Sequence, residues 1–146
     1  MRVVLDTNVI VSGMLAPRGA PARILGHWRA GLLTVLVTAD ILDEYRETLQ
    51  EPSLARRHKR TKGEIDELMA GFELFAEMVV PSESVVAVPD DPDDDVFVSC
   101  GVAGDGRYIV SGDRHLLALR EYRGIRILSP AAFLALLEAG GEGAPP

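Results

Sequence analysis

The sequence lacks several features that would place it in other classes of protein. Its 146 residues include one cysteine, Cys100, which excludes a disulfide framework and a zinc site built from cysteines. No window approaches the roughly 18 consecutive apolar residues that a membrane-spanning helix needs. The sequence has neither a phosphate-cradling glycine-rich loop nor a dinucleotide fingerprint. Met1 and Arg2 lead directly into a strand-like segment, so we expect no signal peptide and a cytoplasmic location.

Positive charge is also scarce. Fifteen Lys and Arg residues against 22 Asp and Glu residues give a net charge of −7, which argues against a protein that coats nucleic acid through a broad basic face. Five of the acidic residues form a run at 90–95, and five of the basic residues form a run at 56–62. We interpret the basic run as a solvated connection between helices. The alternative is that Arg57, Lys59 and Arg60 bind RNA phosphates.

The pattern of apolar residues predicts one α/β domain. Short apolar segments predict strands at 3–5, 34–37, 108–110 and 125–128, with further short pieces at 79–80 and 85–86. Segments with helical periodicity alternate with them, at 7–15, 20–30, 41–50, 63–77, 94–104, 116–117 and 130–138. This alternation predicts a three-layer α/β/α sandwich around a parallel sheet of about five strands. The domain is expected to cover 1–139, with a flexible tail at 140–146.

Four acidic residues follow the predicted strands. Asp6 comes directly after the first strand, and Glu44 lies in the first turn after the second. Asp94 begins the helix after the acidic run, and Asp113 lies three residues beyond the strand at 108–110. Because parallel strands end at the same edge of a sheet, where ligands bind if the strand order reverses, we expect these four residues to share one rim.

Helical geometry separates Glu44 from its neighbour Asp43. On a helix over 41–50, Glu44 lies about 60° from Ile41, at the border of the apolar stripe, whereas Asp43 points to water. Four carboxylates in one place repel each other, and a hard divalent cation such as Mg²⁺ or Mn²⁺ relieves that repulsion. Such an ion also promotes attack of water on phosphorus. The alternative is that each acid only caps a helix, as the helix dipole favours.

The motifs around these acids resemble those of PIN-domain ribonucleases. They are Leu-Asp-Thr-Asn-Val at 5–9, Asp-Glu-Tyr at 43–45, Asp-Pro-Asp-Asp-Asp at 91–95 and Tyr-Ile-Val-Ser-Gly-Asp at 108–113. The resemblance runs in order over about residues 2–137 and is greatest to PIN-family toxins of toxin–antitoxin systems, the relatives of VapC-type toxins. It implies an α/β/α fold, a site for Mg²⁺ or Mn²⁺, and cleavage of single-stranded RNA or a tRNA-like substrate. It also implies a cognate antitoxin and a homodimer.

The resemblance assigns roles to individual residues. Asp6, Glu44, Asp94 and Asp113 match the metal-site acids of the family, although Asp95 is an alternative to Asp94. Asn8 and Ser111 match residues that support these acids. The implied mechanism is hydrolysis by water activated at a metal held chiefly by Asp6, Asp94 and Asp113. Glu44 positions a metal or its water, and the products carry a 5′-phosphate and a 3′-hydroxyl.

Other interpretations remain at this stage. Arg114 and His115 lie beside Asp113, where they either contact substrate or simply begin a surface helix. A Ser111–Asp113–His115 triad is disfavoured because the three residues lie within five positions and no nucleophile-elbow motif is present. An aspartyl-phosphate phosphatase needs a second Asp at position 8, where this chain has Asn8. A catalytically weak or inactive module that binds RNA or protein stays open as the second hypothesis.

Overall fold

Residues 1–140 are described in the computed structural model; the tail predicted at 140–146 lies almost entirely outside the described residues. Within residues 1–140 six strands form one sheet, in the order β3-β2-β1-β4-β6-β5. They are β1 (Arg2–Leu5), β2 (Thr34–Val37), β3 (Glu77–Met78), β4 (Tyr108–Val110), β5 (Glu121–Tyr122) and β6 (Ile125–Leu128). Neighbouring strands are parallel, except that β5 pairs antiparallel with β6.

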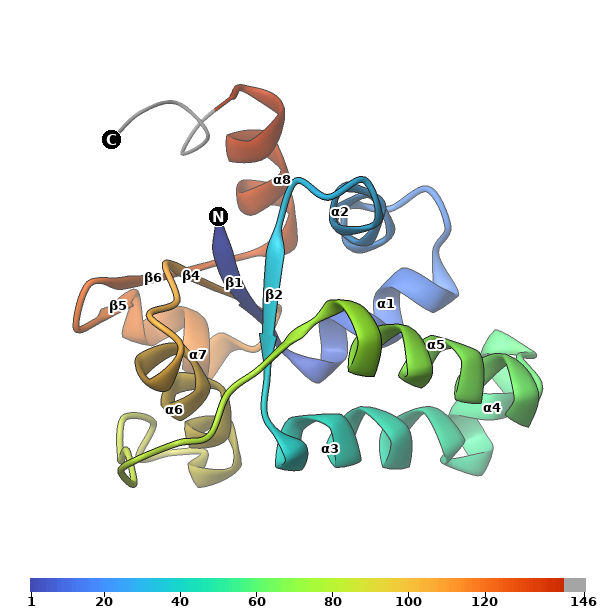
Figure 1. The fold of residues 1–146 in the computed structure, drawn as a ribbon, viewed down its shortest axis with the longest axis horizontal. Helices are drawn as coiled ribbons and strands as arrows, with labels where there is room; N and C mark the ends of the chain where they lie inside the picture. The colour runs from blue at the N-terminus through green and yellow to red at the C-terminus, as the bar shows by residue number, and fades with distance from the viewer. Residues whose placement is uncertain (141–146) are drawn as a thin grey trace.

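The eight α-helices of the described chain cover both faces of the sheet. They are α1 (Thr7–Leu15), α2 (Ala20–Arg29), α3 (Ala39–Gln50), α4 (Pro52–His58), α5 (Lys62–Phe75), α6 (Asp95–Ala103), α7 (Arg114–Leu119) and α8 (Pro130–Glu138). Helix α6 packs on β1, β2 and β4 with α7 nearby, whereas α1, α2 and α8 lie on the opposite side (Figure 1). The predicted three-layer α/β/α architecture is confirmed. Among the helices of residues 1–140, none has the length and apolar character of a membrane-spanning segment.

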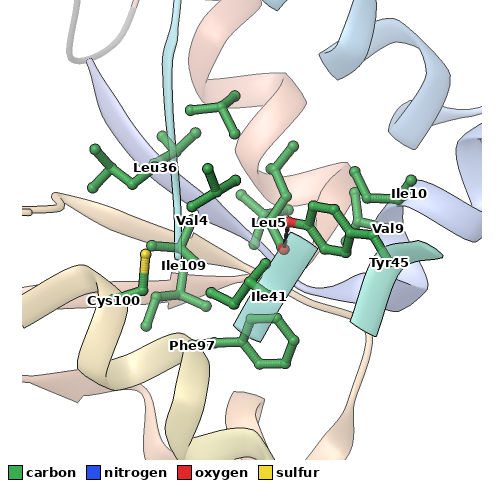
Figure 2. Packing of buried hydrophobic residues seen from close by; sticks show 14 of the residues in the cluster. Val4, Leu5, Val9, Ile10, Leu36, Ile41, Tyr45, Phe97, Cys100 and Ile109 are labelled. Atoms are coloured by element: carbon green, nitrogen blue, oxygen red, sulfur yellow. Dashed lines mark hydrogen bonds between the residues drawn. The ribbon is translucent and has the colours of Figure 1, made fainter. Parts of the chain in front are cut away.

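The central strands are short apolar runs because helices cover both of their faces. Val4 and Leu5 of β1 and Ile109 of β4 are fully buried. Figure 2 shows Cys100 of α6 packed among the aliphatic side chains of the sheet. Burial raises the pKa of the Cys100 thiol to about 12, so this residue acts as a small apolar side chain, as its apolar neighbours in the sequence predict.

The edges of the sheet differ from the prediction. Strand β3 begins at Glu77, two residues before the predicted piece at 79–80, because it pairs with Leu36 and Val37 of β2. The ladder closes where the Val79 N–H donates to the Val37 carbonyl (2.8 Å). The prediction of a strand at 85–86 was wrong, since Val85 is buried in an irregular loop. Strand β5 was not predicted, because it has only two residues, one exposed and one half-buried, and so shows no apolar pattern typical of a strand.

Two helix predictions were also wrong. Helix α3 begins at Ala39, two residues before the predicted start at 41, because Thr38 caps it: the Thr38 Oγ1 accepts from the Ile41 N–H (3.1 Å). The basic run at 56–62 is not a solvated connection throughout, because its first part forms the end of α4.

Helix α4 forms because Pro52 is favoured in the first turn of a helix and because two of its side chains are buried against the rest of the protein. They are Leu54 and His58, which are both buried. His58 Nδ1 accepts from the Arg60 N–H (2.9 Å), so its Nε2 donates to the Leu49 carbonyl (2.9 Å). This histidine joins α4 to α3 and is not available to a ligand.

Candidate metal centre

The candidate site lies where the strand order reverses. From β1 the chain proceeds to β2 and β3 on one side, and then returns to β4 on the other side of β1. The crevice at the carboxyl ends of β1 and β4 is therefore the place where α/β sheets bind ligands. The Asp6 N–H donates to the Val110 carbonyl (2.9 Å), which joins the two strand ends.

Asp6 directly follows β1 and is 5% exposed. Its Oδ2 accepts from Ser111 Oγ (2.5 Å) and from Asn8 Nδ2 (3.2 Å). Its Oδ1 faces the Asn8 N–H at 3.4 Å, in the N-cap position of α1. Burial raises the pKa of Asp6; hydrogen bonds from Ser111 and Asn8 oppose this rise, and the charges of Asp113 and Glu44 add to it.

Asn8 and Ser111 bind the end of β1 to the loop after β4. Asn8 Oδ1 accepts from the Gly112 N–H (3.2 Å), while its Nδ2 donates to Asp6. Ser111 is fully buried, and its Oγ accepts from the Asp113 N–H (2.9 Å) while it donates to Asp6. The two side chains therefore fix the orientation of the Asp6 carboxyl group relative to Asp113.

Asp113 caps helix α7. Its Oδ1 accepts from the N–H groups of His115 (2.7 Å) and Leu116 (3.3 Å). Asp113 and Asp6 thus cap helices α7 and α1, as the helix-cap alternative predicts. Capping does not account for Asp94, whose side chain makes no capping hydrogen bond.

Asp94 ends a short 3-10 turn (Pro92–Asp94) that leads into α6, and it is 8% exposed. Its Oδ2 is buried without a hydrogen-bond partner among the described residues. Burial raises the pKa of Asp94 to about 7, with further contributions from the charges of Asp113, Asp6 and Asp91 and from a hydrogen bond to Asp113. A buried carboxyl group with an unpartnered oxygen among other carboxylates is what a cation stabilises.

Asp95 faces a different part of the molecule. Its Oδ1 accepts from the N–H groups of Ala87 (2.9 Å) and Val88 (2.8 Å). The side chain therefore holds the loop before the acidic run, whereas the adjacent Asp94 faces Asp113.

Glu44 reaches the same crevice from α3. Its Oε2 accepts from Thr7 Oγ1, and its charge contributes to the raised pKa of Asp6. The neighbouring Asp43 is exposed. The charges of Glu44 and Asp113 thus act on Asp6, and those of Asp6 and Asp113 act on Asp94. We call Asp6, Glu44, Asp94 and Asp113 the acidic site.

Two residues extend the acidic site toward solvent. Ligand atoms of Asp91, Asp113 and His115 all lie within 4.8 Å of one another. The sequence indicates His115 only as a candidate for substrate binding, and Asp91 is not among the site residues predicted from it. The only indication of Asp91 in the sequence was its position in the acidic run, because the 3-10 turn that brings Asp91 back toward α7 cannot be recognised from the sequence. Thr7, which contacts Glu44, was also missed.

The predicted RNA-binding residues of the basic run lie elsewhere. Helix α4 is at the opposite end of the view in Figure 1 from α6 and α7. Arg57 and Lys59 are exposed there, and Arg60 pairs with Glu64 (3.5 Å). Arg60 also lines a groove of about 750 Å³ between α2 and α5. Arg114 is exposed beside Asp113, so it is the predicted basic residue that the structure places next to the acidic site.

The donor atoms suit a divalent cation. The acidic site offers carboxylate oxygens, which Mg²⁺ and Mn²⁺ prefer, and it includes the buried, unpartnered Oδ2 of Asp94. The hydrogen bonds from Ser111 and Asn8 to Asp6 orient the carboxylate in the way that supporting residues do around metal ligands. The residues present therefore fit such an ion.

Comparison with known proteins agrees with the fold. The PIN domain family matches residues 2–115, which include all four residues of the acidic site. This chain belongs to the PIN-domain family. PIN domains are typically nucleases and generally use divalent metal ions. The chain is also similar to an uncharacterized protein of Methanocaldococcus jannaschii, with 26% identity over 121 residues that cover 83% of this chain and 76% of the relative.

Proposed function

We propose that this protein is a metal-dependent endoribonuclease that hydrolyses phosphodiester bonds of single-stranded RNA. Asp6, Asp94 and Asp113 hold Mg²⁺ or Mn²⁺, and Glu44 positions a metal or the attacking water. The observation that carries the proposal is the buried carboxyl group of Asp94, which has an unpartnered oxygen and lies against Asp113 near Asp6. A hydrophobic or purely capping role leaves this group without compensation.

The reaction breaks the bond between phosphorus and the 3′-oxygen. The oxygen of a water molecule bonds to phosphorus, one of its protons ends on the departing 3′-oxygen, and the other goes to the 5′-phosphate or to solvent. One product therefore carries a 5′-phosphate and the other a 3′-hydroxyl. A bound divalent cation supplies positive charge that stabilises the transition state and lowers the pKa of water. Ser111 and Asn8 keep the Asp6 oxygens in place, the N-terminus of α7 holds Asp113, and Thr7 holds Glu44. Arg114 is exposed and His115 partly exposed next to Asp113, so RNA bound at the site can contact both side chains.

Cleavage of labelled single-stranded RNA by the purified chain tests this proposal. We expect activity with Mg²⁺ or Mn²⁺, none in excess chelator, and a loss of at least about a hundredfold in Asp6→Asn. Asp43→Asn is the matched control, because it removes an equal charge from an exposed position beside Glu44. Circular dichroism checks that each variant is folded. Full activity in Asp6→Asn or in chelator contradicts the nuclease, and absence of metal binding at millimolar concentration favours the RNA- or protein-binding module.

We further propose that the nuclease is the toxin of a toxin–antitoxin pair with a tRNA-like or other single-stranded RNA substrate. The support is the motif similarity to PIN-family toxins. A homodimer is consistent with exposed apolar side chains near the end of α5 and β3, namely Leu74, Phe75, Met78 and Val80. Growth arrest on expression that the neighbouring gene relieves supports the pair, and light scattering gives the mass in solution. No growth effect and a monomeric mass contradict these two points.

A further inference from the structure

A hydrogen bond from Tyr45 reaches the backbone beside the acidic site. Tyr45 is fully buried in α3, and its hydroxyl donates to the Leu5 carbonyl (2.5 Å), as the dashed line in Figure 2 shows. Tyr45 is the residue after Glu44, and Leu5 is the residue before Asp6. The bond therefore joins the chain next to one acid of the site to the chain next to another.

The Leu5 carbonyl lies where the sheet opens into the crevice. The ladder between β1 and β2 ends at the pairing of Val4 with Leu36, so Leu5 lies beyond the last paired residues on that side. Leu5 is fully buried, and a buried carbonyl without a hydrogen-bond donor costs free energy. The Tyr45 hydroxyl supplies the donor at this position.

The peptide group between Leu5 and Asp6 is thus held at both ends. Its carbonyl accepts from Tyr45 of α3, and its N–H, which belongs to Asp6, donates to the Val110 carbonyl at the end of β4 (2.9 Å). Because a peptide group is planar, two hydrogen bonds at its opposite ends fix its orientation. That orientation sets the direction in which the Asp6 side chain leaves the backbone, relative to both α3 and β4.

Packing holds the ring of Tyr45 in place independently of its hydroxyl. The ring lies against Phe72 of α5, with the two ring centroids 5.2 Å apart, and Phe72 stacks on Trp28 of α2 at 4.8 Å. Tyr45 is part of the apolar core cluster, and Tyr45→Phe retains these ring contacts. The hydroxyl therefore contributes the bond to Leu5 rather than the packing of the core.

We propose that Tyr45 is a positioning residue for metal binding and RNA hydrolysis: through the peptide group between Leu5 and Asp6, it holds the Asp6 carboxylate in the orientation that binds the cation. The inference rests on the proposed function, in which Asp6 is a metal ligand. Tyr45 and Thr7 then act on either side of Asp6 in the chain. Thr7 orients the Glu44 carboxylate, whereas Tyr45 orients the Asp6 backbone.

Tyr45→Phe removes only the hydroxyl, so it tests the proposal directly. Calorimetric titration of the full chain with Mn²⁺ is expected to give a dissociation constant about tenfold higher than that of the wild type, as for loss of a residue that supports a metal ligand. With Mn²⁺ and labelled single-stranded RNA at saturation, kcat is expected to fall about tenfold. The KM for RNA is expected to change less than about twofold, because the buried hydroxyl cannot contact the substrate.

Tyr108→Phe is the matched control. Tyr108 is an equally buried tyrosine, and it lies at the first residue of β4, where its ring packs against Phe133 of α8. We expect this variant to keep the wild-type affinity for Mn²⁺ and the wild-type kcat. Circular dichroism and the melting temperature of each variant separate a loss of stability from a loss of metal binding.

The outcomes separate this inference from the proposed function. An unchanged Mn²⁺ affinity in Tyr45→Phe overturns the positioning role and leaves the nuclease intact, even where the melting temperature falls. Equal losses of affinity in Tyr45→Phe and Tyr108→Phe also overturn it. Losses of affinity and kcat confined to Tyr45→Phe support it. A wild type that binds no Mn²⁺ overturns both proposals, whereas a wild type that binds Mn²⁺ without cleaving RNA overturns the nuclease and with it the role of Tyr45 in hydrolysis.

Discussion

The raised pKa of Asp94 predicts how the free energy of unfolding of the metal-free protein depends on pH. The pKa of Asp94 in the folded protein is about 7, against an ordinary value of 3.8, so folding favours the protonated form. The free energy of unfolding of the metal-free protein must therefore fall as the pH rises from about 4 to about 7. Asn in place of Asp keeps the shape of the side chain and cannot ionise. The Asp94→Asn variant is expected to lack this loss of stability.

The size of the effect follows from the pKa. Each pKa unit corresponds to about 1.4 kcal/mol, so a rise of about three units corresponds to at most about 4 kcal/mol. Solvent at the open side of the site, where Asp91 and Asp113 are partly exposed, screens the repulsion and reduces the expected effect to about 2 kcal/mol. Metal-free Asp94→Asn is therefore expected to be more stable than the wild type by about 2 kcal/mol above pH 7, and nearly equal to it close to pH 4.

Urea unfolding in chelator at several pH values measures this difference. Asp93→Asn is the matched control, because Asp93 is an exposed neighbour in the same turn. A saturating divalent cation is expected to reverse the order, since it stabilises only the chain that binds it. The reasoning is refuted if Asp94→Asn is no more stable than the wild type at about pH 8, or if Asp93→Asn gains as much.

Three further predictions concern neighbouring residues. Asp95→Ala is expected to lower the free energy of unfolding by about 1–3 kcal/mol, because two N–H groups of the preceding loop lose their acceptor; RNA cleavage by the folded fraction persists. Ser111→Ala is expected to weaken metal binding by about 10–100-fold in calorimetry, because Asp6 loses its closest donor. Native Cys100 is expected to resist thiol reagents until urea unfolds the chain. Unchanged stability, unchanged affinity or rapid labelling contradicts the respective prediction.

The inner strands could be predicted from the sequence because burial on both faces leaves an unbroken apolar run. The strands at 34–37, 108–110 and 125–128 lie where the pattern predicts them. The edge strands β3 and β5 could not be predicted, because each has only two residues and depends on pairing with a neighbour. Helix α4 could not be predicted, because most of its residues are polar or charged and only Leu54 and His58 are buried.

The topology of the sheet explains which residues of the acidic site could be predicted from the sequence. Asp6 and Asp113 follow strands that pair with each other, so a parallel sheet alone is enough to bring them near one another. The choice between Asp94 and Asp95 depends on the 3-10 turn at Pro92–Asp94, which directs one side chain to Asp113 and the next to the loop. A shift of this turn by one residue exchanges the directions of the Asp94 and Asp95 side chains. No local sequence pattern determines the position of the turn.

Anomalous diffraction from crystals grown with Mn²⁺ tests the central claim most directly. The account predicts a peak within bonding distance of carboxylate oxygens from Asp6, Asp94 and Asp113. It also predicts that this peak disappears in Asp94→Asn. A crystal equilibrated with millimolar Mn²⁺ that shows no peak among these three side chains would contradict the account.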